Sequence, residues 1–500
     1  MSQRRAGISL SYLSIAFANL IGLVYTPFLL RMMGQSEYGL YSLALSIISY
    51  LSVVDFGFGN ATVRYTALYR SKKEEEKLPA LWGMLLVIYG VISIVALTAG
   101  ILLSLNVDVL FSQSMSSIEL ERMQVLMFLM TFNITISFPL SVFESIMIAY
   151  ERFKFQRGMQ LARTLLQPLI MIPLLIMGYK SIALVILITA LNVVYLLANL
   201  WYCIRKLNVK IKFDFFDIPL LKEIVQYSFW VFLIMVVDKL YWSSGQVILG
   251  VVQGTASVAV FAVALLFRNY ATSFSTVISS VFLPKITRMD TMEEINSLFI
   301  RIGRIQFIIV SLILSGFILF GKMFINLWAG YDYGESYDIA LIILVPLSVP
   351  LIQTLGMSIL QARNRLKFRS YVYLIMAVLC VAMSIPLAKI YGGIGSAVSI
   401  AISLTLGNIL IMNIYYHKKI KIDIPTFWKE ILWMARPVLL LSGVVYLINN
   451  SFSFTENWLN FFLQVALFAT LFLLVVYKWS MNQQERSLIK GVFSKLEFKL

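Results

Sequence analysis

Residues 79–105 read PALWGMLLVIYGVISIVALTAGILLSL, 27 residues without one charged side chain. A helix needs roughly 20 mostly apolar residues to cross the hydrocarbon core of a bilayer, so this stretch predicts a membrane-spanning helix. The rest of the chain is similar, because 60% of its 500 residues are hydrophobic and only 13% are charged. Soluble domains carry about 25% charged residues. The sequence therefore predicts an all-α polytopic membrane protein.

Apolar runs of spanning length follow one another along the chain, separated by short polar connections. We expect about 14 transmembrane helices, at residues 10–33, 38–65, 79–105, 123–150, 164–178, 182–204, 224–250, 256–282, 305–328, 339–360, 371–390, 394–416, 431–448 and 458–477. Their arrangement is expected to be two six-helix bundles followed by two C-terminal helices.

The basic residues predict the orientation. If the N-terminus is cytoplasmic, 32 of the 41 lysines and arginines fall in cytoplasmic segments, five in external segments and four inside spans. Cytoplasmic loops carry such an excess of basic residues. We therefore expect a multi-pass protein of the bacterial inner membrane with both termini in the cytoplasm. Nucleic-acid binding is not expected despite the net charge of +16, because the basic residues form short clusters and no continuous stripe.

Two halves of the chain share a pattern. Residues 149–155 read AYERFKF after the fourth run, and residues 362–368 read ARNRLKF after the tenth. Parallel repeats of this kind are related by an axis along the membrane normal and enclose a cleft. The expected domains are an N-terminal six-helix bundle at 1–204, a cytoplasmic linker at 205–222, a second six-helix bundle at 223–416, and two extra helices with a cytoplasmic tail at 417–500.

Polar and basic side chains inside several spans predict a cavity. Charges at the centre of a span cost about 2.5–3.5 kcal/mol each by insertion scales, so they mark a cavity or pathway by default. In the eighth run an arginine is followed by hydroxyl side chains at helical spacing. The expected lining is Arg268, Lys239, Arg64, Thr272, Ser275 and Ser279. Such a cationic cavity suits a phosphorylated anion, because arginine pairs with phosphate oxygens.

Three acidic residues in the same spans are interpreted as coupling or gating groups: Asp55, Asp238 and Glu144. The alternative interpretation is that they pair with neighbouring cations to hold helices together, and that Arg64 extends to the inner membrane surface. The lone histidine lies among lysines at a cytoplasmic end, and the two cysteines lie in separate apolar runs. No metal site and no cofactor are expected.

The N-terminal residues resemble a known family. The sequence reads PFLLR at 27–31, then EYG at 37–39 and DFGFGNATVRY at 55–65. These motifs resemble the Wzx-type flippases of the polysaccharide transporter family, within the superfamily of multidrug, oligosaccharidyl-lipid and polysaccharide exporters. Gln246 departs from the pattern, since many relatives carry an acidic residue there.

The resemblance implies a function. Such flippases move undecaprenyl-pyrophosphate-linked oligosaccharide repeat units, as for O-antigen or capsule, to the outer leaflet by alternating access through a cationic cavity. It also implies lipid-linked oligosaccharide and membrane lipids as partners, together with glycan polymerase and chain-length machinery, and a monomeric state.

Two other classes of function stay open from the residues alone. A cation-coupled multidrug or small-molecule extruder on the same scaffold predicts an acidic cavity, against which Arg268 and Lys239 argue. A membrane-bound glycan polymerase or ligase needs catalytic groups on a sizeable external loop, whereas the longest expected external connection covers only residues 106–122. We therefore expect a transporter and not an enzyme.

Overall fold

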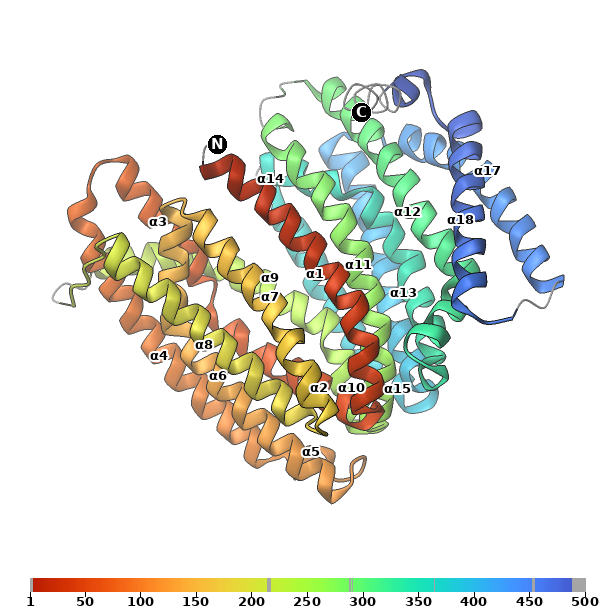
Figure 1. Ribbon diagram of the computed structural model, residues 1–500. Helices are drawn as coiled ribbons and strands as arrows, with labels where there is room; N and C mark the ends of the chain where they lie inside the picture. The colour runs from red at the N-terminus through yellow and green to blue at the C-terminus, as the bar shows by residue number, and fades with distance from the viewer. Residues whose placement is uncertain are drawn as a thin grey trace, which may run out of the picture. The chain divides into compact units, whose positions relative to one another are not determined.

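The structure is a computed structural model that describes residues 3–213, 217–286, 289, 291–363, 365–451 and 455–487 (Figure 1). Twelve helical stretches in this part of the chain are long and apolar enough to cross a membrane. One of them, Leu366–Ile420, contains the eleventh and twelfth expected spans on either side of a kink at Gly392. Helix α1 (Gln3–Met33) contains the first expected span. The predicted fold class, an all-α polytopic membrane protein, is confirmed.

The chain forms two compact units, Met1–Ala262 and Val263–Leu500. The first unit contains α1, α2 (Gln35–Leu51), α3 (Phe58–Ser71), α4 (Leu78–Leu105), α5 (Val107–Phe111), α6 (Ser117–Ala149), α7 (Phe153–Ile176), α8 (Ser181–Lys206), α9 (Ile218–Trp242), α10 (Ser244–Val252) and the start of α11 (Thr255–Ile286). Helices α9 and α10 belong to it because they pack against α2 and α3. The predicted domain boundaries, including the cytoplasmic linker at 205–222 between the sixth and seventh expected spans, stay a prediction.

The core of the first unit lies between α4 and α6, with α8 packed on the other side of α6 (Figure 1). Tyr89 and Leu85 of α4 and Val142 of α6 are fully buried there. The two helices approach closely at Gly100, where an added Cβ would lie 2.3 Å from a side-chain carbon of Thr131. Small residues permit such close approach between membrane helices. The apolar runs thus form a bundle whose polar residues are confined to particular seams.

The second expected span is broken in its middle. Helix α2 ends at Leu51, a single 3-10 turn covers Ser52–Asp55, and α3 begins at Phe58. Phe56 and Gly57 both have left-handed backbone conformations, with φ of 50° and 73°. A positive φ is uncommon outside glycine. The continuous span expected at 38–65 is therefore two half-helices joined at the DFGFG motif.

Contacts with α9 hold the break in place. The ring of Phe56 stacks on that of Phe232, with centroids 4.4 Å apart. A Cβ added to Gly57 would lie 2.6 Å from a methyl group of Val231. Glycine at this position therefore meets two requirements at once, namely the left-handed conformation and the close approach of α9.

The second unit contains the rest of α11 and the helices that follow it. These are α12 (Met292–Trp328), α13 (Glu335–Ile352), α14 (Thr354–Ala362), α15 (Leu366–Leu404), α16 (Met412–Tyr415), α17 (Ile424–Ser451) and α18 (Trp458–Val475). Phe320 of α12, Val438 of α17 and the α18 residues Phe468 and Phe472 form one buried apolar cluster. The two C-terminal helices are thereby packed on α12.

Candidate functional site

The predicted basic residues lie in different units. In the first unit, Arg64 is exposed on α3, and its guanidinium carbon lies 4.5 Å from the ring centroid of Tyr227 on α9. Lys239 is half-buried on the same helix. Since twelve residues separate Tyr227 from Lys239, the two cations are ~18 Å apart along α9. The structure does not bring Arg64 and Lys239 together.

Two hydroxyl groups of the predicted polar stripe on α11 bond to backbone carbonyl groups, one in α11 itself and one in α13. Arg268 is half-buried and donates from Nη1 to Oδ1 of Asn269 at 2.7 Å. The Thr272 hydroxyl donates to the Arg268 carbonyl at 2.9 Å, and the buried Ser275 hydroxyl donates to the Leu351 carbonyl of α13 at 2.6 Å. The Ser279 side chain lies outside the described residues. A water-filled cavity along this stripe stays a prediction.

The three acidic candidates lie in different surroundings. Asp55 is half-buried at the break between α2 and α3, and Asp238 is exposed on α9. Glu144 of α6 accepts hydrogen bonds from the Tyr195 hydroxyl at 2.9 Å and from Nε2 of Gln156 at 3.1 Å. Among the described residues, none of the three forms an ion pair with a predicted cavity cation. Their role in gating or coupling stays a prediction.

Sequence reasoning missed a cation in the interior of the first unit. The expected fifth span began at residue 164 and left Arg163 in a cytoplasmic segment. The structure begins α7 at Phe153, so Arg163 is the eleventh of its 24 residues and lies in mid-span. Its Nη1 donates to Oδ1 of Asn192 on α8 at 2.8 Å. The predicted placement of Arg163 in a cytoplasmic segment is therefore wrong, because the residue lies within the membrane-spanning helix α7.

A polar row on α6 completes this cluster. Nδ2 of Asn192 donates to Oδ1 of Asn133 at 2.7 Å and to the Ser137 hydroxyl at 2.8 Å. Asn133, Ser137 and Glu144 are four and seven residues apart, a spacing that places them on one helix face. This spacing inside an apolar run was the available sequence signal. We call Arg163, Asn192, Asn133 and Ser137 the first-unit polar cluster.

The end of the first unit where α2, α6 and α8 begin has a second polar cluster. The expected topology places this end on the external side of the inner membrane. The buried Glu37 pairs with Arg122 of α6 and accepts a hydrogen bond from Ser181 of α8. A mostly apolar cavity of about 710 Å³ lies beside them. Glu37 thus ties three helices together.

Helices α2 and α10 are joined side to side by polar contacts. The Ser46 hydroxyl donates to the amide oxygen of Gln246, and the hydroxyl oxygens of Ser49 and Ser243 are 3.2 Å apart. Gly39 lies so close to Thr255 that an added Cβ would meet its carbonyl oxygen at 1.9 Å. Gln246, which departs from the acidic pattern of relatives, therefore serves here as a helix-packing residue.

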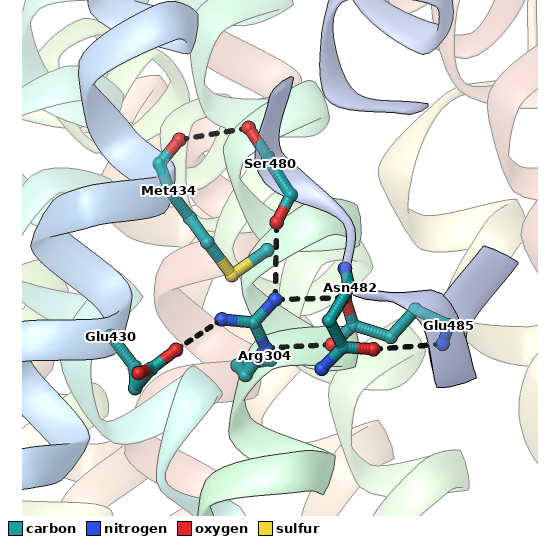
Figure 2. A network of polar contacts seen from close by, with 6 residues as sticks. All are labelled: Arg304, Glu430, Met434, Ser480, Asn482 and Glu485. Atoms are coloured by element: carbon teal, nitrogen blue, oxygen red, sulfur yellow. Dashed lines mark hydrogen bonds and ion pairs between the residues drawn. The ribbon is translucent and has the colours of Figure 1, made fainter. Parts of the chain in front are cut away.

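In the second unit, Arg304 of α12 is 4% exposed and fully engaged (Figure 2). Its Nε and Nη2 donate to the two carboxylate oxygens of Glu485 at 2.7 and 2.9 Å. Nη1 donates to Glu430 of α17 at 2.5 Å, and Nη2 also donates to the Ser480 carbonyl at 3.0 Å. The arrangement attaches α17 and the segment after α18 to α12.

No group of three or more His, Cys, Asp or Glu side chains that could hold a metal ion occurs within the described ranges. The expectation that the protein works without a cofactor stays a prediction.

The fold is shared with solved structures of transporters. The chain is similar to "Lipid II flippase MurJ, inward closed conformation", with 19% identity and a TM-score of 0.76 over 96% of this chain and 100% of that one. It is also similar to a multidrug resistance MATE family transporter in an inward-facing conformation, at 13% identity and a TM-score of 0.58 over 83% and 95%. A third is a MOP superfamily transporter from Pyrococcus furiosus, at 15% identity and 0.53 over 83% and 94%. The chain is thus a polytopic membrane protein with the fold of MOP superfamily transporters.

The sequence assigns the family more narrowly. Residues 5–290 match the family described as polysaccharide biosynthesis protein, which is more than half of the chain. The chain belongs to this family, and the predicted resemblance to polysaccharide transporters is confirmed at this level. No curated protein sequence matches it.

Proposed function

We propose that the protein translocates undecaprenyl-pyrophosphate-linked oligosaccharide repeat units across the bacterial inner membrane by alternating access. The family and the fold shared with a lipid II flippase support a lipid-linked substrate. The observation that carries the proposal is the presence of basic side chains in spans of both units, Lys239 and Arg163 in the first and Arg268 in the second. A basic side chain at such depth in the membrane costs free energy unless an anion or water interacts with it.

The polar head and the apolar tail of the substrate are expected to cross the membrane by different routes. The sugars and the diphosphate need water and hydrogen bonds, so they cross in a hydrated path, while the polyprenyl tail stays in the lipid. The sequence holds no glycine-rich nucleotide-binding motif. An inside-negative potential favours outward movement of an anion by about 2.3 kcal/mol per charge per 100 mV. The membrane potential and an ion gradient are therefore sufficient as the drive.

The proposal includes the topology of the protein, its oligomeric state and its partners. Both termini lie in the cytoplasm, as the distribution of basic residues predicts, and the protein is a monomer that hands its cargo to a glycan polymerase and chain-length machinery on the external side. The cargo is a repeat unit of O-antigen, capsule or a related polysaccharide.

The experiment is translocation by the purified protein in vesicles loaded with labelled lipid-linked oligosaccharide. Arg268→Ala is expected to lower the rate at least about tenfold, because a lost charged hydrogen bond costs about 1.5–3 kcal/mol. Arg205→Ala, at the end of α8, removes the same charge from the membrane surface and is the control. Normal insertion with full translocation by Arg268→Ala would contradict the cationic path.

A second candidate function rests on the similarity to MATE transporters. A cation-coupled extruder of small molecules on this scaffold would lower drug accumulation in cells that lack their own pumps. We expect no such effect, because Lys239 and Arg268 disfavour cationic drugs. A clear decrease in accumulation together with no lipid translocation would favour the extruder.

A further inference from the structure

The first-unit polar cluster is built from three helices that pack together, α6, α7 and α8, whose arrangement Figure 1 shows. Arg163 is the eleventh of 24 residues in α7, Asn192 the twelfth of 26 in α8, and Asn133 the seventeenth of 33 in α6. A basic side chain in a membrane helix often extends to the membrane surface, where its charge is hydrated. Arg163 lies too deep in the membrane for this explanation.

The orientation of the Arg163 guanidinium is fixed by its neighbour. The Asn192 amide uses its oxygen to accept from Arg163 and its nitrogen to donate to Asn133 and Ser137. An amide nitrogen has two hydrogens, so both are used. Asn192 therefore accepts one hydrogen bond from the guanidinium and fixes its orientation. This contact does not involve the other donors of Arg163.

Within the described ranges, no carboxylate neutralises the charge of Arg163. In the described part of the chain no acidic oxygen lies within ion-pair distance of it. Glu144 is itself engaged by the Tyr195 hydroxyl and by Nε2 of Gln156. A guanidinium has five donors, of which Asn192 takes one. Among the contacts of the described residues, Arg163 thus has no carboxylate partner and keeps four hydrogen-bond donors.

The cluster is also accessible. Asn133, Ser137, Arg163 and Asn192 are all half-buried, so each keeps exposed surface at mid-span. Amide and hydroxyl groups beside a guanidinium match both the oxygen atoms of an acidic group and the hydroxyl groups of sugars. An apolar or cationic ligand would find no complementary group there.

We propose that Arg163, positioned by Asn192, is an anion-binding subsite inside the first unit that receives an acidic oxygen group of the cargo. This inference rests on the proposed function and extends it to a residue outside the predicted cavity lining. The acidic group is either the diphosphate of the lipid carrier or the carboxylate of an acidic sugar, which present the same oxygen chemistry to the guanidinium.

The experiment compares three substrates in vesicles that contain the full-length protein: a lipid-linked oligosaccharide with a uronic acid, one with neutral sugars only, and undecaprenyl diphosphate. Arg163→Gln is expected to translocate the recognised substrate about tenfold more slowly. A loss confined to the uronic acid substrate assigns the subsite to the sugar carboxylate. An equal loss for all three assigns it to the diphosphate.

Arg157→Gln is the matched control, because Arg157 lies six residues earlier on α7 and bonds to Gln160 of its own helix. Arg163→Lys keeps the charge without the planar donor pair and should retain part of the rate. Unchanged rates in Arg163→Gln for all three substrates would overturn the subsite.

A binding measurement separates this inference from the proposed function. Inorganic pyrophosphate is expected to raise the unfolding temperature of the purified wild type and of Arg157→Gln, and to raise that of Arg163→Gln less. A merely structural role of Arg163 would lower the unfolding temperature without changing the shift. An equal shift in wild type and Arg163→Gln, or none in the wild type, overturns the subsite even if translocation succeeds. The expected difference in shift upholds it even if no substrate is translocated.

Discussion

Two arginines inside membrane helices have opposite surroundings. Arg304 of α12 is 4% exposed and binds both oxygens of Glu485 as well as Glu430. Arg163 of α7 is half-buried and binds only the neutral amide of Asn192 among the described residues. The first has its charge balanced within the protein, whereas the second retains an unbalanced charge in mid-span.

The two arginines show how a structural charge in a membrane helix can be distinguished from a functional one. A buried charge that holds helices together needs carboxylates with good geometry, because desolvation is otherwise not offset. A charge without such partners is tolerated only where water or a ligand reaches it. Arg304 meets the first description and Arg163 the second, although the sequence presents both simply as an arginine near an apolar run.

Substitution of Glu485 should destabilise the protein more than any other change considered below. Glu485→Gln removes the negative charge from a buried, bidentate ion pair. The positive charge of Arg304 is then no longer balanced inside the protein. Breaking a buried ion pair from one side costs about 3–5 kcal/mol. We expect a marked fall in the unfolding temperature of the detergent-solubilised protein. Translocation per folded molecule should change little.

Glu430→Gln is the comparison variant for this experiment. The Glu430 side chain is 42% exposed, so solvent screens its attraction to Arg304. Exposed pairs contribute about 0–1 kcal/mol. A fall in unfolding temperature as large as that of Glu485→Gln would show that burial does not distinguish the two carboxylates.

An intermediate effect is expected when the surroundings of Arg163 are made to resemble those of Arg304. Asn192→Asp would place a carboxylate against Arg163 in the position of the present amide oxygen. The opposite charge neutralises Arg163. We expect stability to be kept and translocation of an acidic substrate to fall about tenfold, or 1.4 kcal/mol. Retained translocation would show that the free charge of Arg163 is not needed.

The smallest expected effect concerns the start of α17, the helix that carries Glu430. Hydrogen bonds from the Thr426 hydroxyl and from its backbone N–H, the latter at 3.2 Å, lower the pKa of Asp423. A lowered pKa in the folded state stabilises the protein above the unfolded value of about 3.9, and this contribution is lost as the pH falls through the folded pKa.

Asp423→Ala should therefore cost about 0.5 kcal/mol near neutral pH, the low end for a helix cap. The difference from wild type should disappear at acidic pH. Unfolding temperatures between pH 3 and pH 7 measure it, with Asp423→Asn as a control that keeps the cap without titrating. A constant difference over this range would show that the carboxylate charge does not contribute.

The number, order and helical nature of the spans could be predicted from the sequence. Hydropathy is a sum over about 20 residues, so it identifies runs such as 79–105 whatever their packing. It cannot detect a local change of backbone conformation. The break at Phe56 and Gly57 depends on two dihedral angles and on contacts with Phe232 and Val231, which are distant in the sequence.

The candidate site could be predicted only in part, for a related reason. Arg163 precedes a short apolar run, and a hydropathy boundary drawn at residue 164 places it in a loop. The helix begins at Phe153, and contacts within the unit hold its first turns, since Phe155 stacks on Tyr202 of α8 and Gln156 donates to Glu144 of α6. Likewise Ser275 continues a polar stripe in the sequence, but its hydroxyl is used by the Leu351 carbonyl.

The attachment of Arg304 also has a consequence for biosynthesis. Its partner Glu485 follows it by 181 residues and lies beyond the last membrane helix. At about 5–20 residues per second, the ribosome needs roughly 10–40 s to reach it. During that time the only carboxylate of this network that can pair with the Arg304 guanidinium is that of Glu430, which is exposed. The second unit is therefore completed only after α18 has been synthesised, and a chain that stops before Glu485 lacks the buried carboxylate partner of this arginine.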